Sequence, residues 1–107
     1  MLYEELSTGG NMSATETAVM QRILAIDDDP SVTSLLKRGL TYEGFLVETA
    51  GSGEEGLALA RANPPDLVIL DIMMPGLDGL AVLQRLRAVD ARLPVLMLTA
   101  KDAPTDQ

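Results

Sequence analysis

Residues 67–79 read LVILDIMMPGLDG, an apolar run that ends in a single aspartate, Asp71, and continues into a loop. A short apolar run bounded by turn signals is typical of a strand that is buried on both faces of a sheet. In open α/β sheets, ligands bind at the carboxyl ends of the strands. This stretch therefore predicts a buried strand over Leu67–Leu70 that carries Asp71 to a ligand-binding edge.

A second apolar run that ends in acid occurs earlier in the chain. Residues 22–30 read RILAIDDDP, so a predicted strand over Arg22–Ile26 is followed directly by Asp27 and Asp28. The carboxyl ends of neighbouring parallel strands meet at one edge of a sheet. We therefore expect Asp27 and Asp28 to lie close to Asp71.

The rest of the chain alternates helices with strands through short links. Asp29 and Asp78 are typical helix N-caps, and Ser52 with Glu55 forms a predicted capping box. The predicted elements are the strand Arg22–Ile26, a helix that starts at Pro30 and is ended by Gly44, the strand Phe45–Ala50, a helix through Ala62, the strand Leu67–Leu70, a helix through Val89 and the strand Val95–Thr99. This β-α-β-α-β-α-β order indicates an α/β fold, a doubly wound parallel sheet with helices on both faces.

Two helices have apolar stripes that we expect to pack on this sheet. The stripes consist of Val32, Leu35, Leu36 and Leu40 in the first helix and Leu80, Leu83 and Leu86 in the third. Gly44 is predicted to end the first helix. The strands over Arg22–Ile26, Leu67–Leu70 and Val95–Thr99 are apolar enough to be covered on both faces.

Composition narrows the possible chemistry. The chain has 107 residues, enough for one small domain, and 47% of them are hydrophobic. Cysteine and histidine are both absent, which excludes disulfides, thiolate metal sites and histidine-based nucleophile pairs. Metal binding would have to use oxygen ligands, which favour Mg²⁺, Ca²⁺ or Mn²⁺.

Charge and hydropathy limit which binding partners and which cellular location we expect. The formal net charge of −8 disfavours direct nucleic-acid binding, because the domain has no basic stripe to replace phosphate counterions. No apolar stretch is long enough for a membrane helix, so we expect a cytoplasmic protein without a membrane partner. Residues 1–21 are small, polar and weakly patterned, and they are predicted to form a flexible leader before the domain.

Three converging carboxylates would form a cation site. At about 5 Å, each pair repels by roughly 3 kcal/mol at an effective dielectric constant near 20. Such a cluster either raises a pKa or holds a cation, and Mg²⁺ suits oxygen ligands with open positions for water and phosphate. A carboxylate beside Mg²⁺ can act as a nucleophile towards phosphorus. Thr99, at the end of the fourth predicted strand, would place a hydroxyl donor at the same edge.

Three motifs of the chain, AIDDDP, LVILDIMMPGLDG and PVLMLTAKD, resemble those of the receiver domain of two-component response regulators. The resemblance runs from about Arg22 to Asp102. It implies a flavodoxin-like sheet with strand order 2-1-3-4-5. It also implies that the domain is a phosphoacceptor switch in a phosphorelay and not a metabolic enzyme.

The resemblance assigns a role to each residue of the candidate site. Asp27 and Asp28 would bind Mg²⁺ together with Asp71 and the backbone carbonyl of Met73. Asp71 would receive the phosphoryl group from a sensor histidine kinase, with self-phosphorylation and self-dephosphorylation as possible side reactions. Thr99 would contact the phosphoryl group and shift on activation.

The match to the family stops after the fourth strand, so residues 22–107 are expected to form a partial receiver domain. The family's phosphate-contacting lysine and switch aromatic lie on or near strand 5, and Lys101, which follows the fourth strand, is not that lysine. The apolar strand Val95–Leu98 would then lie at the sheet edge. Exposed apolar edges pair readily with other chains, so a homodimer or swapped dimer through this edge is expected.

Other interpretations stay open at this point. The segment Asp27–Ser31 is close to the D-x-D-x-T signature of aspartate-nucleophile phosphatases, in which Asp27 would be the nucleophile and Asp29 the acid. A non-phosphorylated interaction module is a further alternative. Residues 51–56 match G-x-G-x-x-G, but Glu54 and Glu55 would lie where a dinucleotide places its pyrophosphate, which disfavours a cofactor site.

Overall fold

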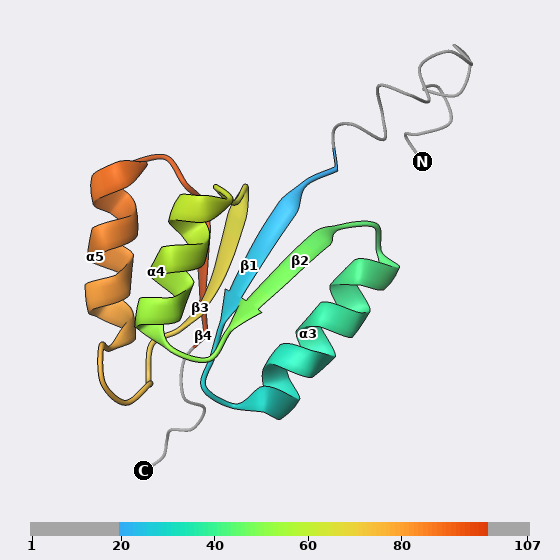
Figure 1. The fold of residues 1–107 in the computed structure, drawn as a ribbon, viewed down its shortest axis with the longest axis horizontal. Helices are drawn as coiled ribbons and strands as arrows, with labels where there is room; N and C mark the ends of the chain where they lie inside the picture. The colour runs from blue at the N-terminus through green and yellow to red at the C-terminus, as the bar shows by residue number, and fades with distance from the viewer. Residues whose placement is uncertain (1–19, 99–107) are drawn as a thin grey trace.

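Among residues 20–98, four parallel strands form the centre of the fold, and three helices cover them (Figure 1). The computed structural model describes residues 20–98. Its elements are β1 (Arg22–Ile26), α3 (Pro30–Tyr42), β2 (Leu46–Ala50), α4 (Gly53–Ala62), β3 (Leu67–Asp71), α5 (Gly79–Val89) and β4 (Val95–Leu98). The strand order is β2-β1-β3-β4, and α4 and α5 lie on one face of the sheet with α3 on the other. The predicted α/β class, element order and two-sided coverage are confirmed.

Alternating side chains of the strands pack into two separate hydrophobic cores, one on each face of the sheet. On the face under α4 and α5, strand residues such as Leu24 and Leu70 pack with Val82 and Leu86 of α5. On the opposite face Ile23 packs with Ala25, Ile69 and partly buried residues that include Leu36 and Leu40 of α3. This alternation follows from the period of two in a strand and is why the central strands are apolar on both faces.

The link between α3 and β2 is a helix cap built on Gly44. The Gly44 N–H donates to the Thr41 carbonyl at 3.0 Å, and the Phe45 N–H donates to the Leu40 carbonyl at 3.1 Å. Gly44 has a φ of +100°, the left-handed backbone that this motif requires and that glycine adopts without steric cost. Because the cap uses the N–H of Phe45, β2 begins at Leu46 and not at Phe45 as predicted.

We expect the substitution Gly44→Ala to destabilise the domain by about 1 kcal/mol, because a Cβ is disfavoured at this positive φ. Space is not the reason, since a Cβ at this position would meet nothing within 4 Å. Urea unfolding followed by circular dichroism would measure the effect. An unchanged transition midpoint would contradict this account of the cap.

Three predicted core residues are instead exposed. The exposed fractions of Leu35, Leu80 and Leu96 are 65%, 56% and 56%. In α5 the buried stripe runs through Gly79, Val82 and Leu86, which turns Leu80 outward. In α3, Leu36 and Leu40 form the stripe towards the sheet, and in β4 the face that carries Leu96 has less helical cover than β1 or β3. No helix among residues 20–98 has the length and apolar character needed to cross a membrane.

Two of the three glycines of residues 51–56 have a packing role. A Cβ on Gly56 would lie 2.4 Å from Cδ1 of Ile26, and one on Gly53 would lie 2.6 Å from a methyl carbon of Val82. Both glycines therefore let α4 approach its neighbours closely. The Ser52 hydroxyl accepts the Glu55 N–H at 3.1 Å, but the Glu55 carboxylate accepts from Gly51 and not from Ser52, so the predicted capping box is formed only in part.

Candidate functional site

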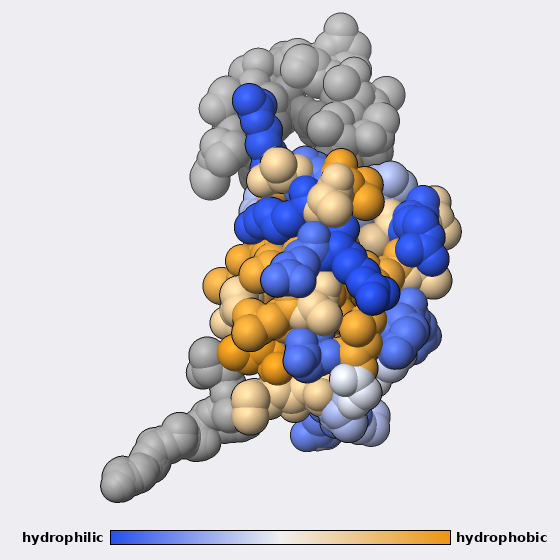
Figure 2. Space-filling model, turned by 90° about the vertical axis from the view of Figure 1, so that its left-hand side faces the viewer, coloured by the Kyte–Doolittle hydropathy of each residue, from blue (hydrophilic) through white to orange (hydrophobic). Residues whose placement is uncertain are grey.

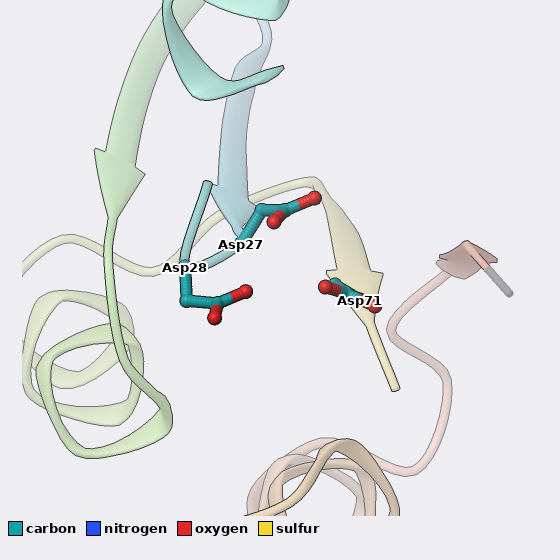
Figure 3. A group of neighbouring side chains, drawn as sticks. All are labelled: Asp27, Asp28 and Asp71. Atoms are coloured by element: carbon teal, nitrogen blue, oxygen red, sulfur yellow. The ribbon is translucent and has the colours of Figure 1, made fainter. Parts of the chain in front are cut away.

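The acidic cluster forms because β1 and β3 are neighbours in register. Ile26 of β1 pairs with Leu70 of β3, so the next residues, Asp27 and Asp71, lie side by side at the carboxyl ends of the two strands. One carboxylate oxygen from each of Asp27, Asp28 and Asp71 lies within 4.8 Å of the other two. The three carboxylates surround the space between the ends of the two strands (Figure 3). The predicted convergence of these three residues is confirmed.

Two similar turns orient the strand-ending carboxylates. Oδ1 of Asp27 accepts the Asp29 N–H at 2.9 Å, and Oδ1 of Asp71 accepts the Met73 N–H at 2.9 Å. This i to i+2 pattern is the turn in which an aspartate side chain bonds to its own following backbone. Each turn fixes one carboxylate oxygen, Oδ1, and does not use Oδ2.

The loop after Asp71 is held in place by the start of α5. A Cβ on Gly79 would lie 2.2 Å from Cα of Ile72 and 2.7 Å from the carbonyl oxygen of Asp71. The helix can approach the strand end this closely only because residue 79 has no side chain. Met74 is buried beneath the loop, whereas the Met73 side chain is exposed. The backbone of Met73 is therefore the part of that residue available to the site.

Burial and charge both act on Asp27. Its exposed fraction is 6%, and it is the only polar residue among the buried side chains of residues 20–98. Burial raises the pKa of the Asp27 carboxyl, and the nearby carboxylates of Asp71 and Asp28 raise it further, against the lowering effect of the Asp29 N–H. A bound cation would reverse this penalty, because it favours the charged form of every carboxylate around it.

A pocket of about 500 Å³ opens above the cluster. Its lining combines the three clustered aspartates with residues from the adjoining loops and strand, namely Asp29, Val32, Met73 and Leu98. The Asp29 carboxylate caps α3, since its Oδ1 accepts from both the backbone N–H and the hydroxyl of Ser31. Carboxylate oxygens are hard ligands, so the donor set fits Mg²⁺.

Two lining residues were not predicted, and one predicted residue cannot be placed. Leu98 reaches the site because it pairs with Asp71 across β3 and β4, and Val32 reaches it from the first turn of α3. The sequence signal for Leu98 was its position at the end of the fourth apolar run. Thr99 follows it but lies outside residues 20–98, so its predicted phosphoryl contact stays a prediction.

Comparison with known protein families identifies the domain. The model of the response regulator receiver domain matches residues 23–107, which is most of the chain. The chain belongs to the response regulator receiver domain family. As a receiver domain it is a signalling domain of two-component systems.

Curated receiver-containing relatives are close in sequence but longer. The chain is 46% identical over 85 residues to the probable transcriptional regulatory protein TcrX of Mycobacterium tuberculosis, which covers 79% of the chain and 36% of TcrX. It is 45% identical over 86 residues to the response regulator MprA of Mycobacterium leprae, covering 80% of the chain and 38% of MprA. The chain thus spans little more than a third of the length of these relatives.

Solved receiver structures share the fold. The chemotaxis protein CheY4 of Vibrio cholerae superposes with a TM-score of 0.75 at 34% identity, over 80% of this chain and 73% of CheY4. The response regulator TrrA of Thermotoga maritima, solved in complex with Mg²⁺-BeF, gives a TM-score of 0.73 at 43% identity, over 78% of this chain and 72% of TrrA. The flavodoxin-like receiver fold is therefore confirmed.

Proposed function

We propose that this receiver domain accepts a phosphoryl group on Asp71 from the phosphohistidine of a sensor histidine kinase. Mg²⁺ would be held by the carboxylates of Asp27, Asp28 and Asp71 and by the carbonyl of Met73. The observation that carries the proposal is the convergence of three carboxylates within 4.8 Å at the ends of β1 and β3. The solved complex of TrrA with Mg²⁺-BeF supports the same assignment by similarity.

The transfer would use the oxygen of Asp71 that its turn leaves available. Oδ2 attacks phosphorus, an O–P bond forms, and the N–P bond of the donor breaks with its electron pair returning to the imidazole nitrogen. The product is an acyl phosphate on Asp71. When bound, Mg²⁺ supplies charge neutralisation between the acidic pocket and the phosphoryl oxygens. The Thr99 hydroxyl would donate to a phosphoryl oxygen, as the family resemblance implies.

The geometry favours Asp71 over Asp27 as the acceptor. Both carboxylates line the pocket, but Asp71 is half-buried whereas Asp27 is buried, so the Asp71 carboxylate is the more accessible of the two to a phosphoryl donor. The phosphatase alternative also needs Asp29 as an acid, but the Asp29 carboxylate caps α3. These observations support a phosphoacceptor domain over an Asp27-dependent phosphatase.

Intact-mass analysis after incubation with acetyl phosphate and Mg²⁺ would test the proposal. We expect the chain to gain the mass of one phosphoryl group, to gain nothing with EDTA, and to gain nothing as Asp71→Asn. The matched control is Asp66→Asn, which removes an exposed aspartate at the opposite end of β3 and should leave the gain intact. Peptide mapping that places the label on Asp27 would favour the phosphatase, and no gain in the wild-type chain would contradict the proposal.

We also propose slow self-dephosphorylation and a cytoplasmic location, as the family resemblance implies. The proposed donor, a sensor histidine kinase, is the partner that the acceptor chemistry requires. Neither direct nucleic-acid binding nor a membrane partner is proposed for this domain, in line with its net charge of −8.

A homodimer or swapped dimer through β4 is a separate proposal. β4 is the last strand of the sheet among residues 20–98, and its Leu96 is 56% exposed. An apolar edge strand can pair with a second chain, and a lysine on that edge opposes pairing. Light scattering should therefore give a dimer mass for the wild-type chain and a monomer mass for Leu96→Lys. A monomeric wild-type chain at high concentration would contradict this.

A further inference from the structure

A groove lies between α4 and α5, at the end of the domain opposite to the acidic pocket. Its volume is about 620 Å³, within the range of roughly 300–1,000 Å³ that is common for binding sites. The buried side chains of Leu57, Leu86 and Leu93 contribute an apolar floor. The wall includes Pro64-Pro65, which precede β3, so the groove is at the end where the strands begin.

The rim of the groove adds unpaired positive charge to this apolar floor. Arg61 from the last turn of α4 and Arg85 from α5 both line it. Neither guanidinium makes an ion pair with another residue of the described range 20–98. The acid in the lining is Asp90, whose Oδ1 accepts the Arg92 N–H. Figure 2 shows the side of the molecule formed by α4 and α5, where strongly hydrophilic residues lie beside apolar ones.

A further arginine and an exposed valine add to the positive charge and the apolar surface of the groove. The Arg87 guanidinium donates to the Leu93 carbonyl, which ties a further cation to the groove wall. Val89, at the end of α5, lines the groove and is 83% exposed. The chain as a whole carries a net charge of −8, so this cationic, apolar groove differs from the average surface of the domain.

We propose that this groove binds an acidic amphipathic helix of a partner protein. The apolar side chains of that helix would rest on the leucine floor, and its carboxylates would bind Arg61 and Arg85. A helix in an apolar groove is a common mode of peptide recognition, and the planar guanidinium suits carboxylates because it can donate two parallel hydrogen bonds. This interaction is independent of phosphoryl transfer, since no residue of the groove belongs to the acidic pocket.

The test is an NMR titration of the complete ¹⁵N-labelled chain. The probe is a synthetic peptide, acetylated and amidated, with leucines at helical positions i, i+3, i+4 and i+7 and glutamates on the flanking positions. We expect chemical-shift changes in the groove, at residues such as Arg61, Arg85 and Val89. A control peptide with lysine in place of every glutamate should bind much more weakly.

Two variants of the groove test the proposed contacts with the peptide. The double substitution Arg61→Gln with Arg85→Gln should weaken binding of the acidic peptide by about 10-fold, the product of two partly exposed ion pairs. The matched control, Lys37→Gln with Arg38→Gln, removes the same charge from α3 and should leave binding unchanged. Val89→Asp should also weaken binding, because it puts an acid on the exposed rim without disturbing the core.

Several outcomes would overturn the proposal. These are the absence of shifts at about 1 mM peptide, shifts confined to α3 or to the acidic pocket, equal binding of the lysine peptide, or equal binding by the double arginine variant with a normal circular dichroism spectrum. Groove signals that move with the concentration of the chain alone would show that a second copy occupies the groove, and would also overturn it.

Discussion

The chain with Gly79→Ala should lose about 3 kcal/mol of folding free energy, because the new Cβ would have to enter space held by backbone atoms. That Cβ would be 2.2 Å from Cα of Ile72 and 2.7 Å from the carbonyl oxygen of Asp71. Backbone atoms of a strand end cannot rotate away as a flexible side chain can, so α5 must move outward. For a domain of this size, the loss corresponds to a fall in Tm of roughly 12–24 °C.

The same substitution should weaken Mg²⁺ binding, because it would displace the backbone of Asp71 and Ile72, and the Asp71 side chain lines the acidic pocket. Differential scanning calorimetry with and without Mg²⁺ would measure both effects. The control is Gly39→Ala inside α3, where a Cβ meets nothing within 4 Å. Alanine is the better helix former, so this control should raise stability by about 1 kcal/mol. A Gly79→Ala variant as stable as wild type would refute the close approach of α5 to β3.

The second large effect is expected for Asp27→Asn. Without Mg²⁺, ionisation of Asp27 places a negative charge in a buried position beside Asp71 and Asp28, which opposes folding. Asparagine removes that charge and keeps an oxygen that can accept the Asp29 N–H. We expect the Tm of the metal-free variant to exceed that of wild type by about 5 °C, which corresponds to ~1 kcal/mol. The control Glu43→Gln removes an exposed acid outside the cluster and should change stability by less than about 0.5 kcal/mol.

Mg²⁺ should reverse this order. At about ten times its dissociation constant, a ligand that binds only the folded state adds roughly 1.4 kcal/mol. The wild-type chain should gain this stability, whereas Asp27→Asn should gain little because one carboxylate ligand is gone. Thermal unfolding across a Mg²⁺ titration would measure the difference. Equal responses of the two chains would contradict the assignment of Asp27 as a ligand.

The pH dependence follows from the direction of the Asp27 pKa shift. The folded state holds the Asp27 proton more tightly than the unfolded state, in which the carboxyl has its ordinary pKa of 3.8. The loss of folding free energy caused by ionisation of Asp27 is therefore absent below pH 3.8. It grows as the pH rises towards the folded-state pKa and reaches its full size above that pKa. In metal-free buffer the stability advantage of Asp27→Asn should shrink on acidification below that pKa, where both side chains are neutral. A stability advantage of Asp27→Asn that increased towards acid pH would contradict the direction of the pKa shift.

Most of the fold was predictable because its signals are local or periodic. The caps at Asp29, Ser52 and Asp78 are all observed, and each helix begins at the following residue. The strand boundaries were less accurate: β2 starts one residue late because the cap on α3 uses the N–H of Phe45. β3 extends to Asp71 because that residue still pairs with Leu98 of β4.

The convergence of the acidic site was predictable for a different reason. Asp27 and Asp71 each come directly after an apolar run, so only the pairing of β1 with β3 was needed to bring them together. The exposure of Leu35 and Leu80 was not predictable from apolar spacing, since both lie within three residues of a truly buried or half-buried position on the same helix. The role of Gly79 was also missed, because no local pattern reveals that the start of α5 nearly touches the backbone of Ile72.

The acidic pocket and the hydrophobic core both depend on the register between β1 and β3. Sliding β3 by one residue would carry Asp71 away from Asp27, but it would also turn Val68 and Leu70 out of the core under α4 and α5. A shift in strand register that changed the distance between these two acids would therefore also disrupt the core. Variation in the chemistry of this domain is confined to the loops beyond the strand ends, where Met73 and its neighbours can change while the spacing of the carboxylates stays fixed.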